Sequence, residues 1–336
     1  MINVENFIIF SDSHFLKHEN MSIHLDDGNL TSWVKLQLYL VAYIFSYATK
    51  HNVKTIIHNG DLFEQKDRIP QDLYNKVWSF LREISKGFDL ILNIGNHDFT
   101  LIYDRFEGSG LMPFSSFAYI PSCVKEMTHN RTFMRIIPYG LATETTITKP
   151  NKKSIDNYIL ILHEEIPGIA FGDSGYRSKR KDISISKLKE WNVVLNGHIH
   201  KPQQIHNIYC IGSVIPVDWG ESSDQKRFIH YQNGSIISIE LPHQKYIRLE
   251  GDLENAKQII GNDTINYYRI KTTLDKINDD IFKRFNVSYD LIKEEQQKVR
   301  IKKDLTILDE AILYSKENNK DLNEDQLIHV AKDLVR

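Results

Sequence analysis

The chain has 336 residues, of which 41% are hydrophobic and 26% are charged, and its formal net charge is −2. This length suffices for one large domain with an appended part or for two domains, and the composition is that of a globular chain. The near-neutral charge excludes a uniformly basic surface, so a polyanionic ligand would have to be held by local groups or by metal ions.

The ends of the chain and its cysteines bear on the compartment. The N-terminal MINVENFIIFSDSH has no basic region before its apolar run, which argues against a signal peptide. The most apolar helical stretch, residues 38–48, is too short to span a bilayer. Two cysteines, Cys123 and Cys210, are too few for a disulfide framework. We therefore expect a cytoplasmic protein that does not enter a membrane.

Five apolar runs dominate the first two thirds of the chain, and each ends in Asp, Asn or His. They cover residues 7–15, 55–63, 90–99, 158–165 and 192–200. Near-continuous Ile, Leu and Val is typical of strands that are buried on both faces. Helical patterns lie between the first three runs, at 31–50 and 71–86. The alternation predicts a layered α/β core with its ligands at the carboxyl ends of the strands.

The pattern changes after His200. Asn233-Gly234 between two strand-like runs predicts a hairpin, and residues 265–273 resemble another strand. A helical face of Ile277, Ile281 and Phe285 follows. We expect three parts: a main domain over 1–250, a small α+β domain over 251–303 and a helical segment over 304–336.

The terminal segment carries two amphipathic patterns, separated by the polar SKENNKDLNED. Its apolar faces either pack on the main body or dock on a helical partner, and the residues leave both readings open.

The polar residues at the strand ends form a constellation with the chemistry of a metal site. In chain order they are Asp12, His14, Asp61, Asn96, His97, His163, His198 and His200. In an extended segment, residues i and i+2 point to the same side, so each D-x-H or H-x-H pair would aim two ligands into one pocket. Imidazoles and carboxylates suit divalent transition metals, and the set is large enough for two ions that share Asp61.

These motifs resemble those of the calcineurin-like metallophosphoesterases. DSH, GD, GNHD, a lone histidine and GHIH match that family's D-x-H, G-D, G-N-H-[DE], H and G-H-x-H over residues 1 to about 245. GDLF, IIPYG and YCIGSVIPVDWGE make the chain most similar to SbcD-type DNA-repair nucleases, relatives of the eukaryotic meiotic-recombination nuclease. The compact length resembles a phage-encoded member, which would act in the host cytoplasm. The resemblance implies two central sheets flanked by helices, a small α+β capping domain and a helical tail.

The resemblance also implies roles for individual residues. One ion would be held by Asp12, His14, Asp61 and His200, and the other by Asp61, Asn96, His163 and His198. The ions would be Mn²⁺, with Mg²⁺ as the alternative. His97 matches the catalytic histidine of the family, and Asp98 would orient it.

Several neighbouring residues have a weaker signal. Many nucleases of this group carry a histidine where this chain has Glu64, which leaves its substrate handling open. His58 and Glu64 are expected behind the metal ligands at most. The basic stretches 176–181 and 298–303 either contact the DNA backbone or form solvated faces. In the first stretch the candidates are Arg177, Lys179, Arg180 and Lys181.

The leading hypothesis is the exonuclease and endonuclease subunit of an SbcCD-type complex that recombines DNA and processes its ends. Its partners would be DNA, an SbcC-type coiled-coil ATPase docked on the C-terminal helices, and a second copy of the chain. The alternative is a phosphatase or cyclic-nucleotide phosphodiesterase that acts on small substrates, because the metal motifs are common to the superfamily. A third reading is a non-enzymatic scaffold, against which the complete ligand set argues.

Overall fold

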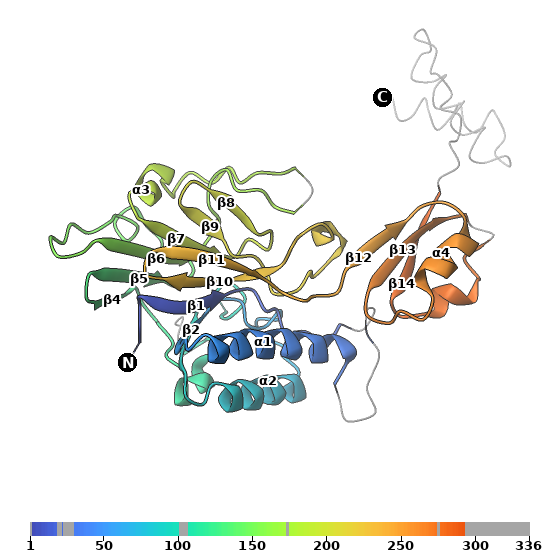
Figure 1. Ribbon diagram of the computed structural model, residues 1–336, viewed down its shortest axis with the longest axis horizontal. Coiled ribbons are helices and arrows are strands. Elements are labelled where there is room, and N and C mark those ends of the chain that lie inside the picture. The colour runs from blue at the N-terminus through green and yellow to red at the C-terminus, as the bar shows by residue number, and fades with distance from the viewer. Residues whose placement is uncertain are drawn as a thin grey trace, which may run out of the picture. The chain divides into compact units, whose positions relative to one another are not determined.

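The computed structural model describes residues 2–18, 22, 30–100, 107–172, 175–273 and 276–292. Two large sheets form the main body, and a smaller sheet is built from the last described part of the chain (Figure 1). All five apolar runs form strands, and the predicted layered α/β architecture is confirmed.

The first sheet is mixed, in the order β11-β10-β1-β2-β3. Its strands are β1 (Asn6–Phe10), β2 (Thr55–Asn59), β3 (Asp89–Asn93), β10 (Arg227–Gln232) and β11 (Ser235–Glu240). The strands β1, β2 and β3 are parallel, and β10 joins β1 antiparallel. Asn233 (φ 48°) and Gly234 (φ 90°) form the predicted two-residue turn between β10 and β11.

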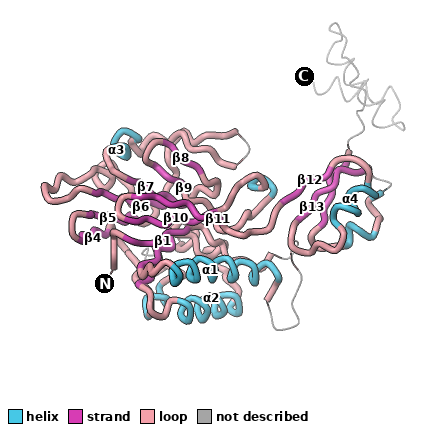
Figure 2. The backbone as a smooth tube through the Cα atoms, viewed as in Figure 1, coloured by secondary structure: helices cyan, strands magenta, loops and turns pink. Residues whose placement is uncertain are grey.

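Two helices cover the outer face of this sheet, α1 (Ser32–Lys50) and α2 (Gln71–Ile84), as Figure 2 shows. The Thr31 side chain caps α1 by accepting a hydrogen bond from the Val34 amide. The apolar faces of both helices pack on sheet residues in one buried cluster. It includes Ile8, Phe10, Ile56 and Leu90 of the sheet with Val41, Ile44, Val77 and Leu81 of the helices. No helix in the described part of the chain is long and apolar enough to cross a membrane.

The second sheet has the order β4-β5-β6-β7-β9-β8. Its strands are β4 (Lys125–His129), β5 (Thr132–Ile137), β6 (Asn157–His163), β7 (Val193–Gly197), β8 (Gln203–Ile205) and β9 (Ile208–Cys210). The central strands β5, β6, β7 and β9 are parallel, with an antiparallel strand at each edge. The short helix α3 (Ile185–Lys189) and loop residues such as Ile147 and Trp191 cover its outer face.

The inner faces of the two sheets share an apolar core. Phe7, Ile9, Ile57 and Ile91 of the first sheet pack with Met134, Ile136, Ile159, Ile161 and Leu195 of the second. Burying each such side chain stabilises the fold by about 1.5–3 kcal/mol. At the carboxyl ends of the strands the sheets are tied by a hydrogen bond from Asn59 Nδ2 to the Leu162 carbonyl (2.6 Å). The predicted ligands lie at this edge.

The third sheet joins β12 (Tyr246–Leu249), β13 (Tyr267–Thr272) and β14 (Val287–Leu291), with α4 (Leu253–Ile260) packed on it. The predicted boundary at residue 250 falls just after the first of these strands. The expected helical face of Ile277, Ile281 and Phe285 is wrong: in the described residues Ile277 and Phe285 lie in turns and Ile281 in the 3₁₀ turn Asp280–Lys283, because the extended backbone of Asp279 (ψ 141°) and Arg284 (ψ 134°) bounds that turn on both sides. The predicted tail helices, 304–336, lie outside the described residues.

Candidate metal centre

One cleft gathers residues from both large sheets. Its volume is about 440 Å³, and it is lined by Asp61, Asn96, His97, Phe171, Gly172, His198, His200, Asp218, Gly220 and Glu221. Asp12, His14 and His163 are buried beside these residues, with exposed fractions of 2% or less. The structure thus brings all eight predicted strand-end residues into one region.

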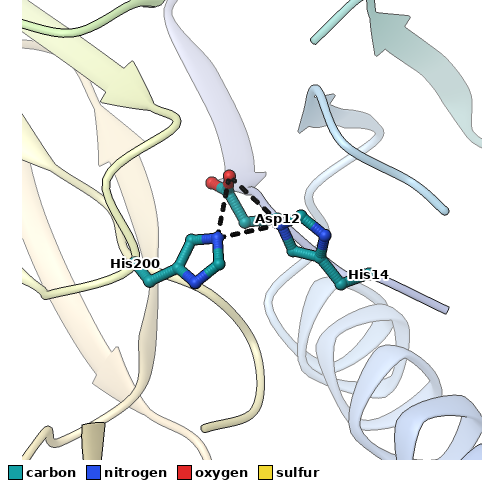
Figure 3. Close-up of side chains that lie close together, drawn as sticks. All are labelled: Asp12, His14 and His200. Atoms are coloured by element: carbon teal, nitrogen blue, oxygen red, sulfur yellow. Dashed lines mark hydrogen bonds and ion pairs between the residues drawn. The ribbon is translucent and has the colours of Figure 1, made fainter. Parts of the chain in front are cut away.

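The first cluster consists of Asp12, His14 and His200 (Figure 3). The Nε2 atoms of the two imidazoles are 2.9 Å apart, and Asp12 Oδ1 lies 3.8 Å from His14 Nε2 and 4.0 Å from His200 Nε2. The Nδ1 atom of each ring lies beside a glutamate. His200 Nδ1 donates to Glu221 Oε1 (2.7 Å), and His14 Nδ1 lies 2.6 Å from Glu64 Oε2 without the alignment of a hydrogen bond. In the neutral rings, two Nε2 lone pairs and a carboxylate converge, which is a donor set that fits a divalent cation.

The second cluster consists of Asp61, His163 and His198, with Asn96 beside them. Asp61 Oδ2 is 3.2 Å from His163 Nε2, and Asn96 Oδ1 is 3.2 Å from His163 Nε2 and 2.7 Å from His198 Nδ1. Asp61 Oδ2 also lies 3.8 Å from His14 Nε2 of the first cluster. The Asp61 carboxylate therefore stands between the two clusters, where an oxygen shared by two ions would have to be.

The electrostatics of the clusters favour positive charge. Burial alone would lower the pKa of His163, but the neighbouring Asp61 and Asp12 carboxylates outweigh it and raise that pKa to about 9. The pKa of His14 is likewise raised well above its usual value, against the effect of burial, by Asp12, Glu64 and Asp61. The field that would draw protons onto these rings is the field that would bind cations.

The backbone at the ligands differs from the expected extended conformation. Asp12, His14, Asp61 and His198 have positive φ values of 55°, 44°, 57° and 70°. Such conformations are unusual for residues with a side chain and cost of order 1–3 kcal/mol each. The prediction that each pair points into one pocket is confirmed for His198 and His200, which line the same cleft, but its reason is wrong, because His198 is not in an extended conformation.

Two glycines of the motifs are needed because other atoms approach them closely. A Cβ on Gly60 would lie 2.3 Å from His163 Nδ1, and Gly60 has a φ of 93°. A Cβ on Gly95 would lie 2.2 Å from Asp61 Oδ1 and 2.5 Å from the Asp61 amide nitrogen. The glycines before Asp61 and Asn96 thus let the two chains meet at the ligands.

His97 lies at the cleft, with its Nδ1 2.5 Å from the main-chain oxygen of Glu64. The prediction that Asp98 orients this ring is wrong. The Asp98 carboxylate instead accepts hydrogen bonds from the amides of Asp61, Leu62 and Gly95 at 2.7–2.9 Å. Burial, followed by the charge of Asp61, raises the pKa of Asp98 to about 6. Asp98 therefore fixes the loops that carry the ligands.

Two residues that the sequence did not single out complete the first cluster. Glu221 Oε1 is 2.7 Å from His200 Nδ1. Lys226 is fully buried, and its Nζ donates to Glu221 Oε2 (2.7 Å), Asp224 Oδ2 (3.1 Å) and the His200 carbonyl (2.9 Å). Glu221 ends the GSVIPVDWGE segment, which was a usable signal, whereas Lys226 had none.

His58 is fully buried, and its Nε2 is 3.0 Å from the hydroxyl of Ser13, between two candidate ligands. Burial lowers the pKa of His58 to about 3, so the ring is neutral near pH 7. His58 thus contacts the ligand loop and no ligand side chain in the described structure.

The basic stretch 176–181 is partly used inside the protein. Arg180 makes ion pairs with the buried Glu164 and with Asp182, both at 2.6 Å, and Arg177 donates to the Gly168 carbonyl. Lys179 and Lys181 are exposed. The second basic stretch, 298–303, lies outside the described residues.

Comparison with known proteins agrees with this architecture. The model of the calcineurin-like phosphoesterase family matches residues 6–202, more than half of the sequence, and the chain belongs to that family. Members typically bind two divalent metal ions, and membership indicates hydrolysis of phosphate esters. A putative phosphoesterase, 078R, of Invertebrate iridescent virus 3 is 26% identical over 189 residues, which are 53% of this chain and 52% of that protein. The match therefore spans about half the length of this viral relative.

Similar solved structures include a dimetal phosphatase from Danio rerio (9% identity, TM-score 0.40, 70% of this chain and 99% of that one). The phosphoesterase YfcE of E. coli (14% identity, TM-score 0.33) covers 69% of this chain and 96% of its own. The nuclease MPE of Pseudomonas putida (13% identity, TM-score 0.32) covers 69% of this chain and 87% of its own.

Proposed function

We propose that the protein is a two-metal phosphodiesterase that cuts DNA, with Mn²⁺ as the expected ion and Mg²⁺ as the alternative. The observation that carries the proposal is the position of Asp61 Oδ2, within 3.2 Å of His163 and 3.8 Å of His14. A carboxylate between two sets of nitrogen and oxygen donors is the arrangement that two adjacent ions require.

The proposed ligand sets follow the two clusters. Position A is formed by Asp12, His14, His200 and the shared Asp61. Position B is formed by Asn96, His163, His198 and the same Asp61.

When bound, two such ions would place positive charge beside the phosphate oxygens. They would also lower the pKa of a bound water molecule to near neutrality. The chain supplies the proton transfer. Because the Glu64 carbonyl can only accept, Nδ1 of His97 carries a hydrogen, and Nε2, once it has taken up a proton from water, can donate that proton to the leaving oxygen. The amide of His97 donates to Asp61 Oδ1 (2.7 Å), so the proposed catalytic ring is anchored to the proposed bridging ligand.

DNA as the substrate is supported by the segment 209–221, which resembles that of SbcD-type nucleases. Its last residue, Glu221, contacts His200 and so takes part in the site. The weak net charge agrees with a site in which metal ions, not a basic surface, hold the phosphate.

The test is degradation of end-labelled linear duplex and single-stranded DNA with Mn²⁺, Mg²⁺ or EDTA, comparing the wild type with His97→Ala. We expect metal-dependent cleavage that EDTA abolishes and that falls at least about 100-fold in the variant. The control is His51→Ala, because His51 is an exposed histidine directly after α1. Turnover of a small phosphodiester without any DNA cleavage would favour the small-substrate alternative.

The partners form a separate part of the proposal. An SbcC-type coiled-coil ATPase would dock on residues 304–336, and the chain would act as a homodimer. A variant ending at Asp304 should lose affinity for the ATPase and keep Mn²⁺ binding. Undiminished affinity would exclude this segment as the docking site.

A further inference from the structure

The imidazoles of position A are backed by carboxylates. His14 Nδ1 lies 2.6 Å from Glu64 Oε2, and His200 Nδ1 lies 2.7 Å from Glu221 Oε1. A carboxylate beside one ring nitrogen favours the tautomer that carries its hydrogen there, and its charge makes the other nitrogen a stronger donor to a metal. Both rings present that other nitrogen, Nε2, to the same point (Figure 3).

The imidazoles of position B have neutral partners. His163 Nδ1 donates to the main-chain oxygen of Asn59 (2.6 Å). His198 Nδ1 lies 2.7 Å from the amide oxygen of Asn96, which is itself a proposed ligand of position B. Among the residues that the structure describes, no carboxylate contacts either Nδ1 atom.

The groups that would contact the ions directly also make position A more negative than position B. Apart from the shared Asp61, position A has the carboxylate of Asp12, whereas position B has the neutral amide of Asn96. Position A therefore has more negative charge both among its ligands and behind them, which favours a divalent cation.

We propose that the two positions have unequal affinity, that position A binds its ion more tightly, and that Glu64 and Glu221 are positioning residues that cause part of this difference. The inference rests on the two-metal site proposed above and deepens it. Position A would keep its ion while the ion at position B exchanges with solution.

Lys226 stabilises one of these carboxylates. Its Nζ holds Glu221 Oε2, so that Oε1 faces His200. Because Glu221 and Lys226 are both buried, changing either one endangers the fold.

Glu64 offers the cleaner test. Its side chain is 39% exposed, and the group that holds His97 is its main-chain oxygen, which no substitution removes. Glu64→Gln therefore replaces a charged acceptor by a neutral one beside His14 and leaves the contact to His97 in place.

The experiment is a calorimetric titration of metal-free full-length protein with Mn²⁺, with free Mn²⁺ counted by electron paramagnetic resonance. We expect two binding events whose dissociation constants differ at least about tenfold. Glu64→Gln and Glu64→Ala should weaken the tighter event about 10- to 100-fold and leave the weaker one unchanged. Asn96→Ala should abolish the weaker event alone, and Glu83→Gln, on the exposed face of α2, should change neither.

Two events of equal affinity would overturn the inference and leave the two-metal proposal standing. The same holds if Glu64→Gln weakened both events alike, or if Asn96→Ala removed the tighter one. Binding of no ion, or of one only, would instead overturn the two-metal proposal. Circular dichroism of each variant shows that any loss of binding comes from a folded protein.

Discussion

The two large sheets contribute different chemistry to one site. The loops after β1, β2 and β3 of the first sheet supply the acidic and amide groups, Asp12, Asp61 and Asn96, together with His14. The second sheet supplies imidazoles only, from the end of β6 and the loop after β7. Positions A and B each draw on both sheets, whereas a third group of possible ligands, His14, Glu64 and His97, comes from the first sheet alone. Neither sheet alone supplies the ligands of position A or position B, so the packing of the sheets and the binding of ions at these positions depend on each other.

The largest expected effect comes from Asp61→Ala, which removes the group between the two clusters. Loss of either ion's contribution costs several kcal/mol, so hydrolysis should fall at least about 1000-fold. The increase in melting temperature that Mn²⁺ gives the wild type should also disappear, because the sheets are no longer joined through the ions. Initial rates and thermal unfolding with and without Mn²⁺ measure both effects.

Asp67→Ala is the matched control for this experiment, because Asp67 is an exposed aspartate six residues further along the chain. Full activity of Asp61→Ala would mean that the two large sheets do not bind the ions jointly.

The second prediction concerns Lys226, the buried cation that holds Glu221 against His200. Lys226→Met removes the buried cation shared by the carboxylates of Glu221 and Asp224, and Asp224 keeps only its longer contact with Lys201 (3.8 Å). The free energy of unfolding should therefore fall by about 3–5 kcal/mol. Against the effect of burial, His200 and Lys226 lower the pKa of Glu221 to about 2.

The sign of the pH dependence follows from this depressed pKa. The stability that ionised Glu221 contributes is fully present above about pH 4.5 and is lost as the pH falls towards 2. The destabilisation by Lys226→Met should therefore be largest near neutrality and shrink below about pH 4.5. Denaturant unfolding of metal-free protein between pH 3 and 7 measures it, and a constant difference across that range would show that Glu221 is not the group concerned.

Sequence patterns predicted the parts of the site that are local. The five strands and the ligand motifs were readable because an apolar run and the polar residues after it are adjacent in the chain. The partners of those ligands were not readable. Glu221 meets His200 and Lys226 only after the loops have folded, and no spacing in the sequence encodes these contacts.

Two errors have the same origin. The positive φ values of Asp12 and His198 are imposed by tertiary contacts, and a rule for extended chains could not anticipate them. Asp98 follows His97 directly, which suggested a contact between their side chains, but three backbone amides satisfy its carboxylate instead.

The third prediction, with a smaller expected effect, concerns the close approach of the loops that follow β2 and β3. A Cβ on Gly95 would lie 2.2 Å from Asp61 Oδ1, so Gly95→Ala must displace the ligand or the loop. We expect a loss of about 1–3 kcal/mol in stability together with reduced Mn²⁺ affinity. Gly110→Ala is the control, because its Cβ would come no nearer than 3.6 Å to any neighbour. Equal behaviour of the two variants would contradict the close approach.

The smallest effect is expected from the loop after β6. It tests whether the second sheet also contacts the DNA substrate. Lys179 and Lys181 are exposed there, whereas Arg180 is held by Glu164 and Asp182. If the lysines contact DNA phosphates, each change to alanine should weaken DNA binding uniformly across sequences and reduce the salt dependence of log K by about 1. Arg180→Ala should instead lower stability, because it leaves the buried Glu164 without its cation.

Fluorescence anisotropy with labelled duplex DNA over a range of salt concentrations separates these outcomes. An unchanged salt slope in Lys179→Ala and Lys181→Ala would limit the second sheet's contribution to its three histidines. Contact with the phosphate would then fall to the ions and the first sheet alone.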